Sequence, residues 1–194
     1  YDFLCTERAK AACQTILQNH VQAVEASKAI DADVIIPGLA DGLVLLPFQK
    51  AGVVYMHQKE RCFNNDVVGL GKTIQAIAVV QLADAYPVQI FCPVTVKENW
   101  RREWTKWVPG KIVAMVSGRN NHVPQGADVY LCNYEILADG YTTELVADKR
   151  SGMMKEVKTI KLTETGKSLL AINAKSIILD ESHRCKSITA QRTQ

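Results

Sequence analysis

A glycine-rich segment, residues 66–73, has the residue types and spacing of a phosphate-binding loop. It reads Asp-Val-Val-Gly-Leu-Gly-Lys-Thr and departs from the strict pattern only at its first position, where Asp66 replaces a glycine. The glycines would let backbone N–H groups face phosphate oxygens, the lysine would supply a cation, and the threonine would offer a hydroxyl to Mg²⁺. The segment predicts nucleotide binding, against the alternative of a glycine-rich turn without a ligand. The residues predicted to bind the nucleotide are Gly69, Leu70, Gly71, Lys72 and Thr73.

A second segment places two carboxylates directly after an apolar run. Residues 177–183 read Ile-Ile-Leu-Asp-Glu-Ser-His. At the end of a strand, Asp180 could hold Mg²⁺ through its water shell, and Glu181 could orient or deprotonate an attacking water. His183 is predicted to sense the γ-phosphate or to couple the site to a neighbouring domain. Alone, such a segment is more often a solvated turn. Together with the loop it predicts ATP hydrolysis, with Lys72, Asp180 and Glu181 as catalytic residues and Thr73 and Asp180 as metal ligands.

The elements that must position these residues alternate along the chain. Apolar spacing and turn residues predict helices over residues 7–30, 47–59, 72–85 and 97–107, and a helix or turn over 134–137. Strands are predicted over residues 61–64, 88–92, 111–116, 128–132, 157–162 and 176–179, with Thr165-Gly166 suited to a hairpin turn. Several strands are apolar on both faces, which is typical of a parallel sheet covered by helices. The predicted fold class is α/β, with ligands bound at the carboxyl ends of the strands.

Composition excludes several other classes of protein. The chain has 194 residues, of which 47% are hydrophobic and 22% are charged, so disorder, collagen and coiled coil are poor interpretations. The longest apolar runs fall far short of the roughly 20 residues of a membrane span, and the first residues do not resemble a secretory signal. The six cysteines form no CxxC pair, so neither a disulfide framework nor a zinc site is predicted. Scattered cysteines of this kind indicate small core residues of a reduced, intracellular protein.

Charge and tryptophan spacing leave two interpretations open. Residues 1–90 carry a formal charge of −2 and residues 91–194 carry +5. The excess is either a solvated surface or the mark of a polyanionic partner. Trp100, Trp104 and Trp107 share one helix face. We favour packing of that face on the sheet over base stacking.

At this point the motifs resemble those of Swi/Snf-type ATPases in helicase superfamily 2. Residues 66–75 and 180–187 resemble motifs I and II of that family, which typically read D-E-x-G-L-G-K-T-I-Q and D-E-A-H-R-x-K-N. Residues 46–53 are similar to its Q-motif region, residues 92–100 to motif Ia and residues 131–137 to motif Ic. The five motifs occur in the family's order from about residue 43 onward. The form of residues 46–53 looks closest to the annealing-helicase branch.

The resemblance implies a RecA-like first lobe, with a mostly parallel sheet, that binds ATP and magnesium. It implies that Gln49 recognises adenine. Family members hydrolyse ATP and track along double-stranded DNA, so DNA is the implied partner and no membrane is involved. The residues implied to contact the DNA backbone are Pro93, Thr95, Lys97, Asn133 and Tyr134, with Ser117-Gly118 a weaker candidate.

The sequence departs from the family pattern just before and within the loop. Val67 and Val68 replace an acidic residue and a methionine, and Asn64 and Asn65 replace apolar or small residues. Two asparagines weaken the preceding strand and could offer side-chain hydrogen bonds near the loop. The departures leave Lys72 and the acidic pair in place, so they do not exclude the chemistry.

The domain organisation follows from the order of the motifs. We expect a helical extension over residues 1–42 and an incomplete first lobe over residues 43–194, with an insertion near residues 140–175. In this superfamily hydrolysis needs arginines from a second RecA-like lobe, which we expect in cis or missing from the sequence given. We therefore expect this lobe by itself to be a fragment that binds nucleotide weakly and hydrolyses it slowly.

Three functions remain open at this stage. The first is the motor lobe of a double-stranded DNA translocase that remodels, strips bound proteins or anneals strands. The second is a superfamily 2 RNA helicase or a restriction-type translocase subunit. The third is a non-catalytic, ATP-gated interaction module. The expected location is intracellular: the cytoplasm or nucleoid in a prokaryote or virus, and the nucleus in a eukaryote.

Overall fold

The structure, a computed structural model, describes residues 6–26, 28–147 and 153–185 of the chain. The chain divides between Ala83 and Asp84 into two compact units, called here the loop unit (residues 1–83) and the sheet unit (residues 84–194). This boundary falls after the glycine-rich segment. The predicted domain boundary between residues 42 and 43 stays a prediction. It is drawn from the order of the motifs, whereas the boundary seen here separates compact units.

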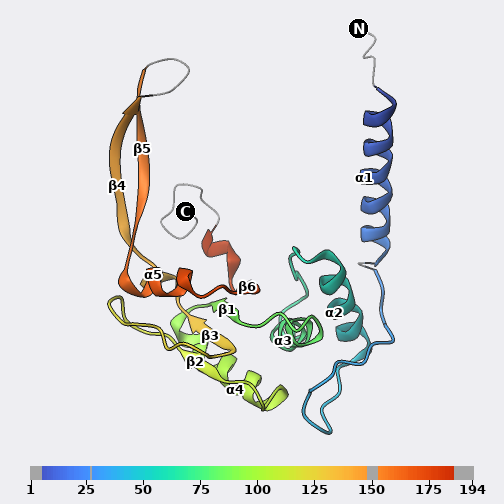
Figure 1. Cartoon of the computed structure of the whole chain (residues 1–194). Coiled ribbons are helices and arrows are strands. Elements are labelled where there is room, and N and C mark those ends of the chain that lie inside the picture. The colour runs from blue at the N-terminus through green and yellow to red at the C-terminus, as the bar shows by residue number, and fades with distance from the viewer. Residues whose placement is uncertain (1–5, 27, 148–152, 186–194) are drawn as a thin grey trace. The chain divides into compact units, whose positions relative to one another are not determined.

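The described residues of the loop unit form three helices, α1 (Glu7–Ala26), α2 (Pro47–Lys59) and α3 (Lys72–Leu82), drawn from blue to green in Figure 1. Pro47 begins α2 because its fixed φ suits the first helical position, where no N–H is needed. These positions confirm the three helices predicted here, although α1 ends at Ala26 and α3 at Leu82, each before its predicted end at residue 30 or 85. On α1, Ile16 and Leu17 are exposed.

Helices α2 and α3 pack closely against one another. Val53 of α2 and Ile77 and Ala78 of α3 are fully buried. A Cβ atom on Gly52 would lie 2.2 Å from Oε1 of Gln75, so only glycine allows this approach without a shift of the Gln75 side chain. The start of α3, where the glycine-rich loop ends, is thereby fixed against α2.

The strand predicted over residues 61–64 is wrong, because the structure has no strand there. Instead, Oδ1 of Asn64 accepts a hydrogen bond from the backbone N–H of Asp66 at 3.1 Å, and its Nδ2 donates to Oε1 of Gln75 at 3.3 Å. Asparagine side chains that bond to nearby backbone favour turns over strands. The expectation that asparagine weakens this strand and bonds near the loop is confirmed for Asn64.

The sheet unit is built on four parallel strands, in the order β2-β3-β1-β6. These are β1 (Val88–Phe91), β2 (Val113–Met115), β3 (Val129–Cys132) and β6 (Ser176–Leu179). Every residue of β1 and β3 is buried, as expected of central strands in a parallel sheet. Strand β6 lies at the edge of this sheet, so Ile177 and Leu179 remain exposed. The α/β fold class with a parallel central sheet is confirmed.

Helix α4 (Lys97–Trp107) packs against β2 and β3 through its tryptophans. Trp100, Trp104 and Trp107 are 3%, 0% and 5% exposed. Tyr86 meets the ring of Trp104 edge to face at a centroid distance of 6.3 Å. The predicted packing of this helix face is confirmed, and rings buried in this way are not available to stack on bases.

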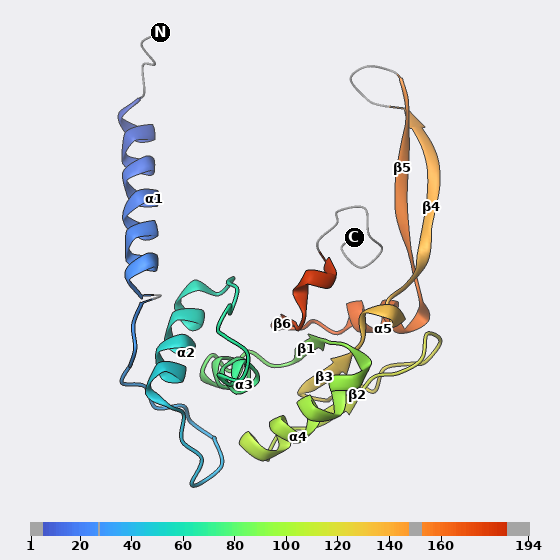
Figure 2. The same cartoon turned by 180° about the vertical axis from the view of Figure 1, so that it is seen from behind.

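The predicted insertion near residues 140–175 contains a β-hairpin and a helix. Strands β4 (Ala138–Ala147) and β5 (Met154–Leu162) pair antiparallel in a separate two-stranded sheet, so they do not extend the central sheet. Residues 148–152 lie outside the described residues. Figure 2 shows the strand pair as a long ribbon joined to α5 (Glu164–Ala171).

The predicted hairpin turn at Thr165-Gly166 is wrong, because both residues belong to α5. Oγ1 of Thr163 accepts a hydrogen bond from the Gly166 N–H at 2.9 Å and caps the helix. A threonine followed by a glycine can begin a helix as readily as a turn, and the cap decided between them.

The cysteines are divided between surface and core. Cys92 and Cys132 are buried, as predicted, but Cys13 and Cys62 are exposed, so the expectation of core positions is wrong for them. Both exposed cysteines belong to the loop unit, where α1 and the segment after α2 lie at the surface. Cys5 and the side chain of Cys185 lie outside the described residues. Within the described part of the chain, no helix is long and apolar enough to cross a membrane.

Candidate active site

The glycine-rich loop turns into α3 through two glycines in left-handed conformations. Gly69 has φ 90° and Gly71, the residue before α3, has φ 77°. A side chain is disfavoured in this region, and a Cβ atom on Gly71 would also lie 2.6 Å from Nε2 of Gln49. The first N–H groups of α3 remain free of intrahelical partners at this end, which is the arrangement that binds phosphate.

Lys72 bonds to its own loop in the described structure. Its Nζ donates to the carbonyl oxygen of Asp66 at 2.7 Å and to that of Val67 at 3.4 Å. The ammonium group therefore spans the segment that would enclose a phosphate. A bound anion would compete with these two neutral carbonyls, and charge-assisted hydrogen bonds are roughly twice as strong as neutral ones.

Gln75 fixes the loop from inside the unit. Its side chain is fully buried, and its Nε2 donates to Oδ2 of Asp66 at 2.8 Å and to the carbonyl oxygen of Leu70 at 3.4 Å. With the bond from Asn64, the amide uses both its donor and its acceptor. Asp66, which stands where the strict loop pattern has glycine, is thus an anchor for the loop.

Gln49 connects the start of α2 to the same loop. Its Oε1 accepts from the N–H of Leu46 at 2.9 Å, and its Nε2 donates to the carbonyl oxygen of Leu70 at 3.1 Å. The side chain is 7% exposed. Leu70 is thereby held by two glutamines, and the implied role of Gln49 in recognising adenine stays a prediction.

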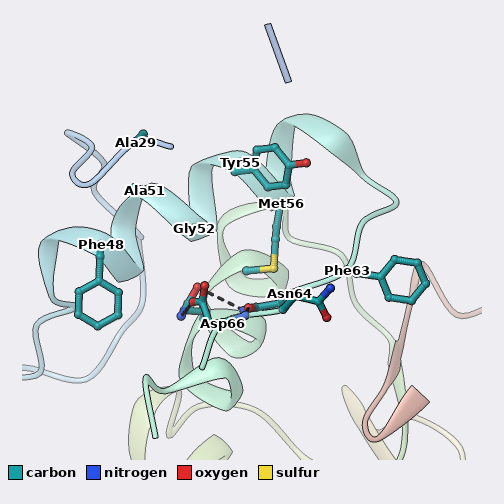
Figure 3. A pocket seen from close by; sticks show the side chains of 11 residues that line it. Ala29, Phe48, Ala51, Gly52, Tyr55, Met56, Phe63, Asn64 and Asp66 are labelled. Carbon is teal, nitrogen blue, oxygen red and sulfur yellow. Dashed lines mark hydrogen bonds between the residues drawn. The ribbon is translucent and has the colours of Figure 1, made fainter. Parts of the chain in front are cut away.

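A pocket of about 360 Å³ lies beside the loop within the loop unit. One face of α2, including Phe48, Gly52 and Tyr55, forms one wall, and the segment that leads into the loop forms another (Figure 3). The side chains of Asn64 and Asp66 point into the region between them. Gln49 is not among the lining residues, and its side chain bonds to Leu70.

The acidic pair follows the last residue of β6. The N–H of Asp180 donates to the carbonyl oxygen of Phe91 at 2.9 Å, which continues the pairing of β6 with β1. The carbonyl oxygen of Asp180 accepts from the hydroxyl of Tyr134 at 2.8 Å, and its Oδ2 accepts from the indole Nε1 of Trp100 at 2.8 Å. Asp180 is therefore held through its backbone by β1 and Tyr134, and through its carboxylate by Trp100.

Glu181 turns away from the strand in a left-handed conformation, with φ 55°. This conformation costs a residue other than glycine about 1 kcal/mol or more, so the surrounding structure must impose it. Oε2 of Glu181 lies 2.9 Å from Nδ1 of His183, and both side chains are more than half exposed. Of the motif resembling motif II, residues 186–187 lie outside the described residues.

The five residues implied to contact DNA belong to two segments of the sheet unit. Pro93 and Thr95 lie at the start of a short 3₁₀ helix (Val94–Val96), and Thr95 is exposed whereas Pro93 is buried. Asn133 and Tyr134 follow β3 and are also buried. The implied DNA contacts stay predictions, and Thr95 offers the most accessible side chain of the five.

Lys97 is buried rather than displayed. Its Nζ donates to the carbonyl oxygen of Val116 and, at 3.4 Å, to Oδ1 of Asn133. Burial lowers the pKa of the Lys97 ammonium, while the neighbouring thiols of Cys132 and Cys92 act in the opposite direction. In the described structure this lysine joins the segments after β1, β2 and β3 and does not present a charge to the surface.

Two residues that position the candidate site carry little sign of it in the sequence. Gln75 lies at a helical position whose burial depends on α2, and Trp100 looks like one of three packing tryptophans. Both fall inside motifs that the sequence already singled out, which is the available signal. The Trp100 bond joins residues 80 positions apart, and the burial of Gln75 depends on the packing of α3 against α2, so spacing alone shows neither.

The loop unit thus carries a glycine-rich loop that turns into a helix, and the sheet unit carries a parallel sheet with two acids after its edge strand. The family model for the SNF2-related domain matches residues 48–194. The chain therefore belongs to the SNF2-related domain family, and the predicted resemblance is confirmed.

Individual relatives agree with this assignment. The chain is 32% identical over 157 residues to the DNA annealing helicase and endonuclease ZRANB3 of Mus musculus, covering 77% of this chain and 13% of that protein. It is 29% identical over 150 residues to the SWI/SNF-related matrix-associated actin-dependent regulator of chromatin subfamily A-like protein 1 of Bos taurus, covering 76% of this chain and 13% of that protein. The chain thus spans only about an eighth of the length of these relatives.

A solved structure supports the fold. The Sulfolobus solfataricus SWI2/SNF2 ATPase core in complex with dsDNA matches with a TM-score of 0.60 and 23% identity, over 82% of this chain and 30% of that chain. The similarity shows a shared RecA-like fold.

Proposed function

We propose that this chain is the ATP-binding lobe of a motor that hydrolyses ATP and moves along double-stranded DNA. The observation that carries the proposal is that a member of the SNF2-related domain family has both a glycine loop in left-handed conformations that leads to Lys72 and a strand that is followed by Asp180 and Glu181. The names of the relatives, a DNA annealing helicase and a chromatin regulator, support DNA as the partner.

The chemical roles follow from the contacts of each residue. Lys72 would exchange its bonds to loop carbonyls for bonds to phosphate oxygens. Glu181, at its exposed and strained position, would orient the attacking water and accept its proton. Gln49 already donates a hydrogen bond to the Leu70 carbonyl. If Gln49 recognised adenine, a change in its side-chain position would therefore alter its bond to the loop.

Oxygen donors suited to Mg²⁺ are present in each of the two units. Mg²⁺ prefers hard oxygen ligands and keeps several waters, which fits the Thr73 hydroxyl at the start of α3 and the Asp180 carboxylate after β6. When bound, the metal would neutralise charge on the phosphates. We infer that Asp180, fixed by its three hydrogen bonds, holds the metal through water.

Further parts of the motor are proposals of the same kind. A second RecA-like lobe would supply the arginines that stabilise transition-state charge. Thr95 and the backbone around Pro93 would meet the DNA backbone, since Thr95 is exposed there. For such a protein we infer an intracellular location, the nucleus in a eukaryotic cell.

The test is ATP hydrolysis by the full-length protein with double-stranded DNA, single-stranded DNA or RNA added. We expect double-stranded DNA to stimulate hydrolysis most. Glu181→Gln should lower kcat by about 100-fold or more while nucleotide still binds, since a general base contributes roughly that factor. Lys72→Ala should weaken both binding and hydrolysis.

Lys10→Ala is the matched control, because Lys10 is an exposed lysine paired with Glu7 on α1. It should leave hydrolysis unchanged. Stimulation by RNA alone would favour an RNA helicase. Absence of any ATPase activity with DNA present would end the motor proposal, and unchanged cellular function of Lys72→Ala would favour a non-catalytic module.

A further inference from the structure

Trp100 differs from the other tryptophans of α4 in what its indole N–H meets. Its Nε1 donates to Oδ2 of Asp180 at 2.8 Å, across 80 residues of sequence. Nε1 of Trp107 donates instead to Glu103, one turn earlier on the same helix, at 3.1 Å. An indole has one donor and no acceptor, so the Asp180 bond uses the whole polar capacity of Trp100.

The Trp100 ring has little freedom to move. It is 3% exposed, and α4 packs on β2 and β3. A buried indole is rigid, with only two side-chain torsions, and a donor on such a ring holds a fixed direction. The position of Oδ2 of Asp180 is therefore set by how α4 packs on the sheet.

The hydrogen bond from Trp100 fixes the side chain of Asp180, whose backbone is already held. The backbone N–H is held by Phe91 of β1 and the backbone carbonyl by the hydroxyl of Tyr134. Without Trp100, these two bonds would fix the backbone but leave rotation about the side-chain torsions. The indole removes that rotation and still leaves Oδ1 and the remaining lone pairs of the carboxylate for other partners.

The indole N–H of Trp100 is a suitable donor to a carboxylate that binds a cation. An arginine or lysine at position 100 would orient Asp180 equally well but would compete with Mg²⁺ through its own positive charge. The neutral indole orients the carboxylate without cancelling its charge. Partners of this kind, which hold a metal-serving carboxylate in place, typically affect metal affinity or activity by about 10- to 100-fold.

We propose that Trp100 is a positioning residue that orients the Asp180 carboxylate for Mg²⁺ in the nucleotide complex. This inference rests on the proposed function, in which Asp180 serves the metal. It assigns Trp100 a polar role in addition to the packing role that it shares with Trp104 and Trp107.

The test uses Trp100→Phe in the full-length protein, with Trp107→Phe as the matched control on the same helix. A fluorescent, non-hydrolysable ATP analogue is titrated at a series of Mg²⁺ concentrations and also in EDTA. We expect Trp100→Phe to raise the Mg²⁺ concentration for half-maximal binding about 10-fold and to leave binding in EDTA unchanged. Trp107→Phe should stay within about twofold of the wild type in both.

Each outcome has a distinct meaning. Weaker binding of Trp100→Phe in EDTA as well as in Mg²⁺ would show general damage to the lobe and overturn the positioning role. A Mg²⁺ dependence equal to that of the wild type would also overturn it. If the wild type binds the analogue with no dependence on Mg²⁺, the proposed metal site fails, and the role of Trp100 fails with it.

A measurement on the wild-type sequence covers the case in which Trp100→Phe does not fold. The protein is labelled with 5-fluorotryptophan, and ¹⁹F NMR spectra are recorded with the analogue before and after Mg²⁺ is added. We expect the Trp100 resonance to shift on addition of Mg²⁺ and the Trp107 resonance to stay in place. A stationary Trp100 resonance, under conditions where Mg²⁺ strengthens analogue binding, would overturn the proposal.

Discussion

The loop unit and the sheet unit hold their candidate functional residues by different means. In the loop unit, side chains do this work: Gln49 and Gln75 donate to the Leu70 carbonyl, and Lys72 donates to that of Asp66. In the sheet unit, the strand backbone places the acid, because the Asp180 N–H continues the ladder between β6 and β1, and the Trp100 side chain then orients the carboxylate. The glycine-rich loop is thus fixed by polar side-chain contacts that a ligand can replace, whereas Asp180 is placed by a strand.

The difference teaches how each half would respond to a ligand. The Lys72 bonds run to neutral carbonyls, and a phosphate would replace them with charge-assisted bonds. The Asp180 backbone bonds run to the buried strand β1 and to the Tyr134 hydroxyl, and they need not change when a ligand binds. We expect the loop to rearrange on binding, whereas the position of Asp180 is set in advance, as electrostatic catalysis requires.

The largest expected contrast between the units is in the reactivity of their cysteines. Burial raises the pKa of the Cys132 thiol to about 12 and that of Cys92 to about 11, whereas Cys13 is exposed on α1. At pH 8 roughly one Cys132 in ten thousand is the reactive thiolate. We expect iodoacetamide to alkylate Cys13 about 1000-fold faster than Cys132. Mass spectrometry of samples taken over time measures the two alkylation rates.

The pH dependence adds a second readout. Because the pKa of Cys132 lies far above the working range, its alkylation rate should rise about tenfold per pH unit between pH 8 and pH 9. In guanidinium chloride the two cysteines should react at similar rates. Comparable rates in the folded protein would mean that the sheet unit opens readily, and the contrast between the units would be lost.

A second prediction compares a close-contact glycine in each unit. A Cβ atom on Gly166 would lie 2.2 Å from the backbone carbonyl oxygen of Leu137, and one on Gly52 would lie 2.2 Å from the end of the Gln75 side chain. Backbone cannot give way as a side chain can, so Gly166→Ala should destabilise its unit by about 3 kcal/mol and Gly52→Ala by about 1–2 kcal/mol.

Native-state hydrogen exchange of peptides from α5 and from α2 measures these local free energies of opening. Gly110→Ala is the control, because a Cβ atom there would meet nothing within 4 Å. It should change the free energy of opening by no more than about 0.5 kcal/mol. A larger loss for Gly52→Ala than for Gly166→Ala would show that the side-chain contacts of the loop unit are the more rigid ones.

The smallest expected effect concerns the loop itself. Gln75→Ala removes the donor to Asp66 and Leu70 and leaves Asn64 without its acceptor. Losing such buried bonds should loosen the loop and weaken nucleotide affinity about tenfold, or about 1.4 kcal/mol. Titration of the full-length protein with a fluorescent nucleotide measures this affinity.

Gln81→Ala is the matched control on the same helix, since the Gln81 amide donates to the Pro37 carbonyl away from the loop. It should bind nucleotide like the wild type. If Gln75→Ala also binds normally, the loop geometry does not depend on the glutamine, and the contrast with the strand-held Asp180 would need another origin.

Most elements of the fold could be predicted from local patterns. The α2 and α4 helices occur at their predicted positions, because apolar spacing and Pro47 define them within a few residues. The predictions of a strand over residues 61–64 and of a turn at Thr165-Gly166 are wrong. Each of these segments depends on a side chain, Asn64 or Thr163, bonding to nearby backbone, and such bonds compete with the patterns of regular structure.

The sequence by itself determined which residues belong to the loop and the acidic pair, because the types and spacing of glycine, lysine and carboxylate residues indicate their chemistry. It also determined the family, since five motifs follow one another in order. Only the tertiary structure decided that Lys97 is buried, that Gln75 anchors the loop, and that Trp100 meets Asp180. The physical reason is that burial and long-range hydrogen bonds depend on which elements pack together, and no local pattern contains that information.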